Sequence, residues 1–483
     1  MTTARWFTAS AVLLAVCLGA LALFAQHSSP TRASAVRHAV QPTQARSLAT
    51  TYYVNSAHGS DSSSGTTEAT AWKTLANVDS HVFAPGDHIE FARGGTWTGQ
   101  LHPLGSGLPG DPIVIGAYGS GARPRFVYSR SSIPNGEIGA AIFLLNQGYW
   151  TIHHVAAYAP AAASNFGTLA QPGQARYGIF VADNGGGTIS GITISDNSVS
   201  GVGGCFNCSD VDSHLNGGII VEAVRRNDSF HDVDISHNRV TDVARSGIVV
   251  WDQSYYTTSI VQVVASQLST GVIIEHNSLS MIAGDGIIVF GTAGAVVDGN
   301  TVRDAAQRTI IGSTEAASVG IMTTRAIGSV IEHNRVSGTL TQFTDGEGYD
   351  VDLGSTDTVV EYNYSQDNEG GFLLFVGGFS SGLVVRDNTS VNDAYSGLKG
   401  VFSFDTSATS VSIYDNTVKI PRGSPARLIF CQNCAPAAYN VWSFFDNVID
   451  GSGHGVSVLP PGTTMTTTPG GPIAYSAGDP GKA

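Results

Sequence analysis

Positive charge is scarce in this sequence. The 483 residues contain 24 Lys and Arg against 38 Asp and Glu, charged residues make up only 13% of the chain, and the formal net charge is −14. Nucleic acids and acidic membrane surfaces are held by concentrated positive charge. We therefore exclude both as partners, and a strongly polyanionic substrate is disfavoured for the same reason.

The N-terminal segment lacks charge over twenty residues, from Trp6 to Ala25. Arg5 and the amino terminus provide a weak positive charge before an apolar centre, which is the order found in export signals. About 20 apolar residues also span a bilayer, so residues 1–25 are either a cleaved signal peptide or a membrane anchor. Residues 26–50 have no periodicity and are predicted to be a disordered linker. We expect a secreted, extracellular protein with no membrane contact unless this segment stays uncleaved.

Helical periodicity is also missing, and a repeated strand pattern takes its place. The pattern is apolar, any residue, apolar, two polar residues and Asn. Its nine copies end at Asn197, Asn238, Asn277, Asn300, Asn334, Asn363, Asn388, Asn416 and Asn447. Period-2 strands divided by Asn and Gly turns are typical of a solenoid of stacked strands. Asn suits such a turn because it tolerates left-handed backbone and its amide can hydrogen-bond from coil to coil.

A second strand follows most of these turns and usually opens with Gly, as in SGIVVW and DGIIVF. Because side chains alternate along a strand, aligning the glycines sorts the side chains into two faces. Two almost entirely apolar columns then point inward: Ile179, Ile219, Ile248, Ile287, Ile321, Tyr349 and Phe372, and Val181, Val221, Val250, Val289, Thr323, Val351 and Leu374. Such stacking predicts an all-β fold, a single right-handed parallel β-helix over residues 140–451 with a tail at 452–483.

The segment from Thr51 to Phe126 contains TYYVNSAHGSDSSSG, AWKTLANVDS and PGDHIEFARGGTWTGQL. It resembles the N-terminal cap of secreted bacterial β-helix proteins, the pectate-lyase-like superfamily of polysaccharide lyases and glycoside hydrolases. The resemblance implies a small cap and first coils over residues 51–139, together with the fold and secretion. It says little about the reaction, since the superfamily contains lyases, hydrolases, epimerases and binding proteins.

Acidic residues gather in residues 347–375, where seven occur among twenty-nine positions. With the neighbouring strand residues inward, Asp350 and Asp352 point outward, and their Cβ atoms should lie about 7 Å apart. Carboxyl groups at this spacing can serve a glycosidase as acid and as base or nucleophile, and their repulsion raises one pKa, as a general acid requires. We predict Asp350 and Asp352 as the catalytic pair, with Glu347 and Glu369 as alternates.

A stripe of outward aromatic residues is predicted beside this pair. It comprises Trp251, Phe290, Phe375 and Phe404, in the column that contains Asp352. Aromatic side chains outside a β-helix have no core to fill and are suited to stacking on sugar rings. Arg325, one coil before the pair, completes the predicted substrate-binding set. The alternative is that long loops or the cap cover the stripe.

Cysteine is rare, and four of the five cysteines form two short motifs: Cys205 and Cys208 in GCFNC, and Cys431 and Cys434 in FCQNC. Four cysteines can hold one zinc ion. Seven or eight coils separate the motifs, on the order of 35 Å, so one zinc cannot take both pairs. Each pair is expected to close a local disulfide or to stay reduced. The histidines that precede a repeat Asn are predicted to be turn residues rather than metal ligands: His237, His276 and His333.

Three classes of function fit these observations. The leading one is a secreted glycoside hydrolase that cleaves a polysaccharide or oligosaccharide with the outward carboxylates and needs no cofactor. The second is a polysaccharide lyase, in which calcium on the acidic residues neutralises a uronate and Lys399 or Arg325 abstracts the proton. The third is a non-catalytic glycan-binding or surface β-helix protein. We expect a monomer in each case.

Overall fold

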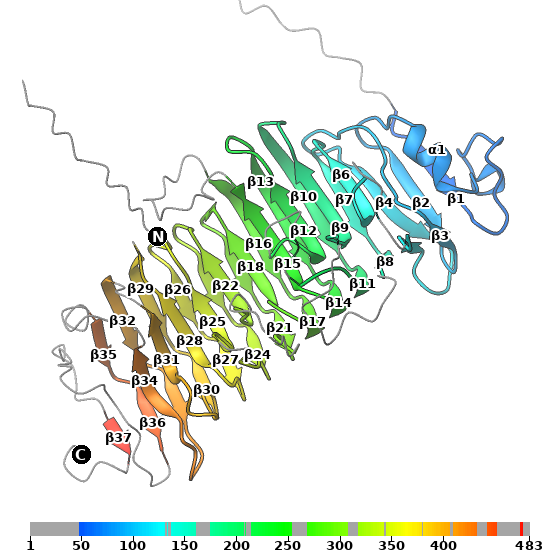
Figure 1. Cartoon of the computed structure of the whole chain (residues 1–483). Coiled ribbons are helices and arrows are strands. Elements are labelled where there is room, and N and C mark those ends of the chain that lie inside the picture. The colour runs from blue at the N-terminus through cyan, green and yellow to red at the C-terminus, as the bar shows by residue number, and fades with distance from the viewer. Residues whose placement is uncertain are drawn as a thin grey trace, which may run out of the picture. The chain divides into compact units, whose positions relative to one another are not determined.

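A computed structural model of the chain shows parallel strands stacked coil upon coil (Figure 1). It describes residues 48–130, 133, 137–160, 174–206, 208, 214–253, 268–307, 317–341, 344–378, 380–405, 409–431, 442–451 and 474–476. The predicted signal or anchor, residues 26–47 of the predicted linker, most of the predicted tail and Cys434 lie outside the described residues. Among the described residues, no helix is long and apolar enough to cross a membrane.

The described coils contribute strands to three parallel sheets. The 14-stranded sheet contains β1 (Thr51–Val54), β2 (His88–Ala92), β4 (Ile113–Tyr118), β7 (Trp150–His153), β10 (Thr188–Ser195), β13 (Ser229–Ser236), β16 (Ser269–Glu275), β19 (Thr292–Ala293), β20 (Val296–Asp298), β23 (Val330–Glu332), β26 (Val359–Glu361), β29 (Ser381–Arg386), β32 (Thr409–Tyr414) and β35 (Trp442–Phe445). The 13-stranded sheet contains β3 (Thr96–Thr98), β5 (Arg125–Val127), β8 (Ala156–Tyr158), β11 (Ser198–Val202), β14 (Arg239–Val243), β17 (Ser278–Ile282), β21 (Thr301–Arg303), β24 (Arg335–Ser337), β27 (Tyr364–Gln366), β30 (Thr389–Val391), β33 (Thr417–Lys419), β36 (Val448–Asp450) and β37 (Ala474–Ser476).

The third sheet has ten strands and carries the residues of functional interest. It contains β6 (Ala140–Leu145), β9 (Tyr177–Asp183), β12 (Gly217–Ala223), β15 (Ser246–Asp252), β18 (Ile287–Phe290), β22 (Ile321–Thr324), β25 (Glu347–Val351), β28 (Gly371–Val376), β31 (Gly400–Asp405) and β34 (Arg427–Cys431). The described helical elements are η1 (Glu68–Thr70) and α1 (Leu75–Ser80), which lies beside the first strands (Figure 1). The predicted all-β parallel β-helix is confirmed.

The interior core follows the predicted columns through six coils. In the 10-stranded sheet Ile179 pairs with Ile219, and the same column continues to Tyr349. The column of Val181 continues in the same way to Val351. These apolar side chains are almost completely buried in one cluster. Removal of apolar surface from water therefore supplies the main favourable term in stacking the coils.

The register of the last member of each column was predicted wrongly, although Phe372 lies in the interior core as expected. Tyr349 pairs with Leu373 rather than Phe372, and Val351 pairs with Phe375 rather than Leu374. Two adjacent glycines, Gly370 and Gly371, stand where this strand begins. The predicted alignment placed Gly371 opposite Gly348, whereas in the structure Gly371 pairs with Glu347. A slip of one residue moves every later side chain of a strand to the other face.

The nine repeat asparagines form one column of turns, as predicted. At each step the backbone N–H of one Asn donates to the side-chain oxygen of the Asn in the next coil, at 2.9 to 3.1 Å. All nine side chains are at most 2% exposed. The left-handed residue is the one before each Asn, such as His237 with a φ of 56°, and not the Asn itself. The ladder thus satisfies backbone groups that the turn would otherwise bury without a partner.

Replacing an asparagine in the middle of this ladder should destabilise the protein. Asn300 accepts from the backbone N–H of Asn277 at 2.9 Å and donates to the carbonyl of Ile274 at 2.8 Å. Asn300→Ala leaves both groups buried without these partners, so we expect a loss of about 2–4 kcal/mol in the free energy of unfolding measured in urea. Asn184→Ala, at an exposed position, is the matched control. Equal stability of the two variants would contradict a structural ladder.

Candidate active site

Asp350 lies on β25 and points to the outer face of the 10-stranded sheet. Its neighbours in register are Met322 on β22 and Leu374 on β28, and Met322 belongs to an apolar cluster outside the sheet. Asp352 follows β25 with the same parity, and its backbone N–H donates to the carbonyl of Thr323. Both carboxyl groups therefore face outward, as strand alternation predicts.

Four carboxyl groups meet around β25, and we name Asp345, Glu347, Asp350 and Asp352 the acid cluster. Glu347 is fully buried and Asp350 is 2% exposed. The side chain of Asp345 is 21% exposed, and Asp352 is also partly exposed. The acid cluster thus consists of two buried carboxyl groups and two that reach the surface.

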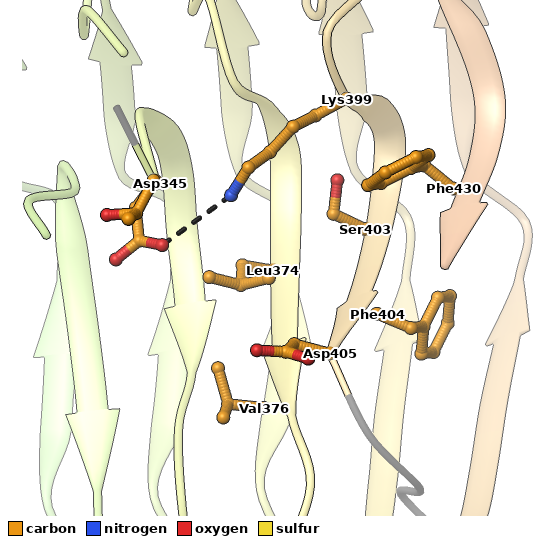
Figure 2. A pocket seen from close by; sticks show the side chains of 9 residues that line it. Asp345, Leu374, Val376, Lys399, Ser403, Phe404, Asp405 and Phe430 are labelled. Atoms are coloured by element: carbon orange, nitrogen blue, oxygen red, sulfur yellow. Dashed lines mark ion pairs between the residues drawn. The ribbon is translucent and has the colours of Figure 1, made fainter. Parts of the chain in front are cut away.

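Lys399 provides a positive charge at the acid cluster. Its Nζ lies 3.2 Å from Glu347 Oε1 and 3.5 Å from Asp345 Oδ1, and Figure 2 shows it extending toward Asp345. Burial lowers the pKa of Lys399, but the negative charges of Glu347 and Asp345 outweigh burial and the pKa is raised. Lys399 is therefore an ammonium at neutral pH and neutralises only part of the cluster.

The remaining negative charge makes the acid cluster hold protons. Burial raises the pKa of Glu347 to about 7 and that of Asp352 to about 6. The pKa of Asp350 is raised well above its ordinary value by burial and by the charges of Asp352, Asp345 and Glu347. Burial also raises the pKa of Asp345, although Lys399 opposes this shift. The site thus offers protonated and ionised carboxyl groups at the same pH, which acid–base catalysis requires.

A pocket adjoins the acid cluster over β28 and β31 (Figure 2). It encloses about 420 Å³ of space, part of it open to solvent. Its lining residues are Thr344, Asp345, Leu374, Val376, Lys399, Ser403, Phe404, Asp405 and Phe430. Charged, hydroxyl and apolar groups are mixed in this lining. A pocket of this size and composition suits a small part of a polar ligand.

Phe375 and Phe404 do not belong to the outward stripe, contrary to the sequence prediction. Both side chains lie in the interior core, at 0% and 1% exposure, and their rings stack with centroids 4.9 Å apart. The error follows from the one-residue slip at β28. Val376 and Asp405 pair at the next position and face outward instead, so neither phenylalanine ring can stack on a bound sugar.

Trp251 and Phe290 do face outward, but they are covered. Their rings stack at 3.9 Å, and they are only 2% and 4% exposed. The guanidinium of Arg325 lies 5.6 Å from the Phe290 ring centroid. The two aromatic residues belong to the apolar cluster outside the sheet. For these two rings the alternative expectation, that other parts of the chain cover the aromatic stripe, therefore describes the structure.

Glu369 has a local partner outside the acid cluster. Its carboxylate accepts from the backbone N–H of Thr341 at 2.9 Å, and its own N–H donates to the carbonyl of Thr339. These contacts tie the loop before β28 to the preceding coil. Glu369 does not line the pocket.

Sequence reasoning missed a buried ionic network and one pocket carboxylate. Arg245, Asp285 and His214 contact one another beside the outer apolar cluster. Asp405 lines the pocket from β31. Arg245 lies two residues before the strand-opening Gly247, and Asp285 lies directly before Gly286, which was a usable signal in the repeat. His214 lies in a loop outside the repeat, where no periodic pattern marks it.

The cysteine and histidine predictions concern other parts of the molecule. Cys205 and Cys208 form a disulfide, as expected for pairing within a motif. The three histidines that precede a repeat Asn, His237, His276 and His333, have left-handed φ values of 56°, 53° and 53° and lie in turns. Two groups of described side chains come close enough to share a metal ion: Glu275, His276 and Asp298, and Asp298, Glu332 and His333. Neither group includes a member of the acid cluster.

The raised pKa values predict that the protein loses stability as the pH rises. A carboxyl group with a raised folded-state pKa contributes stability that is present below its unfolded pKa and lost as the pH rises through the folded pKa. The Tm of the wild type should therefore fall between pH 5 and pH 8 because Asp352, Glu347 and Asp350 resist ionisation. Asp350→Asn removes one such group, and its Tm should fall less over this range.

Thermal unfolding at constant ionic strength measures this difference. Asp357→Asn, at an exposed turn, is the matched control and should keep the slope of the wild type. A Tm of Asp350→Asn that falls as steeply as that of the wild type would contradict the assignment of a buried, protonated Asp350.

Comparison with known proteins agrees with this architecture. A family model described as a right-handed beta helix region matches residues 217–418. A lacto-N-biosidase of Bifidobacterium longum subsp. longum is 27% identical over 453 residues, which cover 78% of this chain and 28% of that protein. The chain thus spans less than a third of the length of that relative.

Solved structures show the same fold. The crystal structure of a GH136 lacto-N-biosidase from Eubacterium ramulus has a TM-score of 0.71 at 22% identity, covering 83% of this chain and 68% of that chain. The A-module of a mannuronan C-5 epimerase from Azotobacter vinelandii has a TM-score of 0.51 at 11% identity, covering 80% and 92%. The chain therefore has a right-handed parallel β-helix fold, as the sequence predicts, and it is similar in sequence to a lacto-N-biosidase.

Proposed function

We propose that this chain is a glycoside hydrolase, with the acid cluster and the adjoining pocket as its active site. The observation that carries the proposal is the gathering of four carboxyl groups and Lys399 at β25, where Asp345 and Lys399 also line the adjoining pocket. Glycosidases use such a pair, one carboxyl group as acid and the other as base or nucleophile. The sequence similarity to a lacto-N-biosidase supports the same class of reaction.

Asp352 and Asp345 are the carboxyl groups that we assign to contact with the substrate, because both are partly exposed. Asp352 has a pKa of about 6 and donates its proton to the glycosidic oxygen as the bond to the anomeric carbon breaks. Asp345 lies 3.5 Å from the Lys399 ammonium, which opposes the rise that burial causes in the pKa of Asp345. Its carboxylate either attacks the anomeric carbon or takes a proton from the attacking water.

Asp350 and Glu347 take a supporting role in this proposal. The sequence prediction placed Asp350 in the catalytic pair and Glu347 among the alternates. Their burial keeps them from direct contact with a sugar, so we assign Glu347 to fixing Lys399 through their ion pair and Asp350 to the charge balance of the acid cluster. Trp251, Phe290 and Arg325 then bound the site from the preceding coils rather than form an open platform.

The substrate that we propose is an oligosaccharide containing the disaccharide unit for which lacto-N-biosidases are named. We also propose that the enzyme acts outside the cell. The uncharged segment at residues 6–25 supports export, and the Cys205–Cys208 disulfide fits an oxidising compartment.

A lyase is less consistent with the site. Proton abstraction by Lys399 needs an uncharged amine, whereas the ion pairs with Glu347 and Asp345 raise the pKa of this lysine. The same ion pairs place an ammonium where a lyase would place calcium. Products that absorb in the ultraviolet, or inhibition by EDTA, would revive this alternative.

Substitution of the exposed carboxyl groups tests the hydrolase directly. Asp345→Asn and Asp352→Asn should each lower kcat/KM on a lacto-N-biose-containing oligosaccharide on the order of a hundredfold or more. The decrease in kcat/KM of Asp352→Asn should be smaller on p-nitrophenyl lacto-N-bioside than on the oligosaccharide, because p-nitrophenolate leaves without protonation. On the oligosaccharide, Asp350→Asn should lower kcat/KM less than Asp345→Asn or Asp352→Asn does. Products are quantified by chromatography and mass.

Glu361→Gln is the matched control, since Glu361 pairs with Arg386 at the ends of β26 and β29 in the 14-stranded sheet, away from the acid cluster, and its kcat/KM should stay within a few-fold of wild type. Full activity of both Asp345→Asn and Asp352→Asn would contradict the assigned pair. If those two variants cleave the substrate normally and Lys399→Ala does not, the lyase alternative, with Lys399 as the base, would be indicated instead.

A further inference from the structure

Three carboxyl groups lie in register at the ends of neighbouring strands of the 14-stranded sheet, and we name them the carboxyl stack. Glu275, the last residue of β16, pairs with Asp298, the last residue of β20, and Asp298 pairs with Glu332, the last residue of β23. Neighbouring strands lie about 4.8 Å apart. Like charges directly opposite one another destabilise a sheet, so the carboxyl stack calls for a positive charge.

The next coil shows how the repeat supplies such a charge elsewhere. Glu361 continues the stack after Glu332, and it forms an ion pair with Arg386, its partner in the following coil. The carboxyl stack itself has no such partner. Among the described residues, its ion pairs are with a histidine, and none is with Lys or Arg.

Two histidines approach Asp298 from the coils before and after it. His276 follows Glu275 and His333 follows Glu332, and both are exposed. His333 Nδ1 lies 3.0 Å from Asp298 Oδ1 and 3.7 Å from Glu332 Oε2. On the other side, one ligand atom each from Glu275, His276 and Asp298 lie within 4.8 Å of one another. Asp298 is therefore common to two groups of metal-ligating side chains.

The coil between the two histidines carries a glycine at their position in the turn. A Cβ atom at Gly299 would lie 2.3 Å from His276 Nδ1, so the imidazole of His276 occupies the space that a side chain there would fill. Gly299 also has a φ of 63°, which glycine adopts without strain. The missing side chain lets His276 lean over the coil that contains Asp298.

The distances at His333 fit a zinc-type ion. Zinc binds imidazole nitrogen and carboxylate oxygen at about 2.0–2.2 Å, so two ligands of a tetrahedral ion lie about 3.4 Å apart. The separations of 3.0 Å and 3.7 Å lie on either side of this value. Imidazole ligands suit zinc and related transition metals, whereas calcium takes oxygen ligands.

We propose that Asp298, Glu332 and His333 bind a divalent transition-metal ion of the zinc type, and that Glu275 and His276 add ligands on the other side of Asp298. The ion neutralises the carboxyl stack and links successive coils at their outer surface. This site is separate from the proposed active site, which lies on the 10-stranded sheet. It departs from the sequence prediction, in which the two histidines are turn residues and not metal ligands.

Titration of the full, untagged chain with ZnCl₂ in a calorimeter tests the site. Zinc should bind with saturable heat, and CaCl₂ should not. Asp298→Asn and His333→Gln should each raise the Kd for zinc on the order of 100-fold or more, because losing a residue that only supports a metal ligand already costs about 10–100-fold. His276→Gln should raise the Kd less than His333→Gln does.

Thermal unfolding provides a second measurement. An ion that binds only the folded state raises the Tm, so ZnCl₂ should raise the Tm of the wild type but not that of Asp298→Asn or His333→Gln. His237→Gln is the matched control: His237 has the same place in the turn one coil before His276 but belongs to neither group of ligands. Its Tm should rise with zinc as the wild type's does.

The variants need no glycan to be informative, because metal binding is measured directly. Each should have the Tm and the circular dichroism of a folded β protein without zinc, since the altered side chains reach the surface. Their kcat/KM on a glycan should equal that of the wild type. A wild type without saturable zinc binding would overturn the inference, as would Asp298→Asn and His333→Gln proteins that bind zinc as tightly as the wild type.

Discussion

The register between successive coils is the constraint on which the rest of the structure depends. It is held by the buried asparagine ladder at one turn and by the apolar columns of the interior. Because side chains alternate strictly along a strand, this register alone decides that Tyr349 fills the core while Asp350 faces outward. The position of a carboxyl group on the outer face therefore depends on contacts inside the β-helix, which extend over several coils before and after it.

The acid cluster is unfavourable for stability, and its surroundings show how the fold accommodates it. Four carboxyl groups with two side chains buried would repel one another, and Lys399 and proton uptake relieve only part of this repulsion. Arg245 and Asp285 form a second buried charge pair in the neighbouring coils. Both groups lie on the outer side of the 10-stranded sheet, whereas the asparagine ladder inside the coils consists of uncharged amides paired with backbone groups. Because the apolar core and the mutually repelling carboxyl groups lie on opposite faces of the sheet, the protein can hold these carboxyl groups without losing its fold.

The sequence predicted the fold well because every coil repeats the same pattern. The nine asparagines and six of seven members in each inward column fell where the pattern placed them. The single slip occurred at Gly370 and Gly371, where two glycines made the alignment ambiguous, and it misplaced Phe375 and Phe404. Burial of Asp350 and Trp251 could not be predicted, because covering loops follow no period. His214 escaped notice for the same reason, and its partners Arg245 and Asp285 meet across different coils.

The central claim is that a glycan binds over the acid cluster and is cleaved there. A crystal structure of the Asp352→Asn protein soaked with lacto-N-biose tests it most directly. The account predicts sugar density at the mouth of the pocket, with a hydroxyl or the anomeric carbon within contact distance of the Asp345 carboxylate. Density for the sugar on another face of the β-helix, with the pocket filled only by water, would contradict the account.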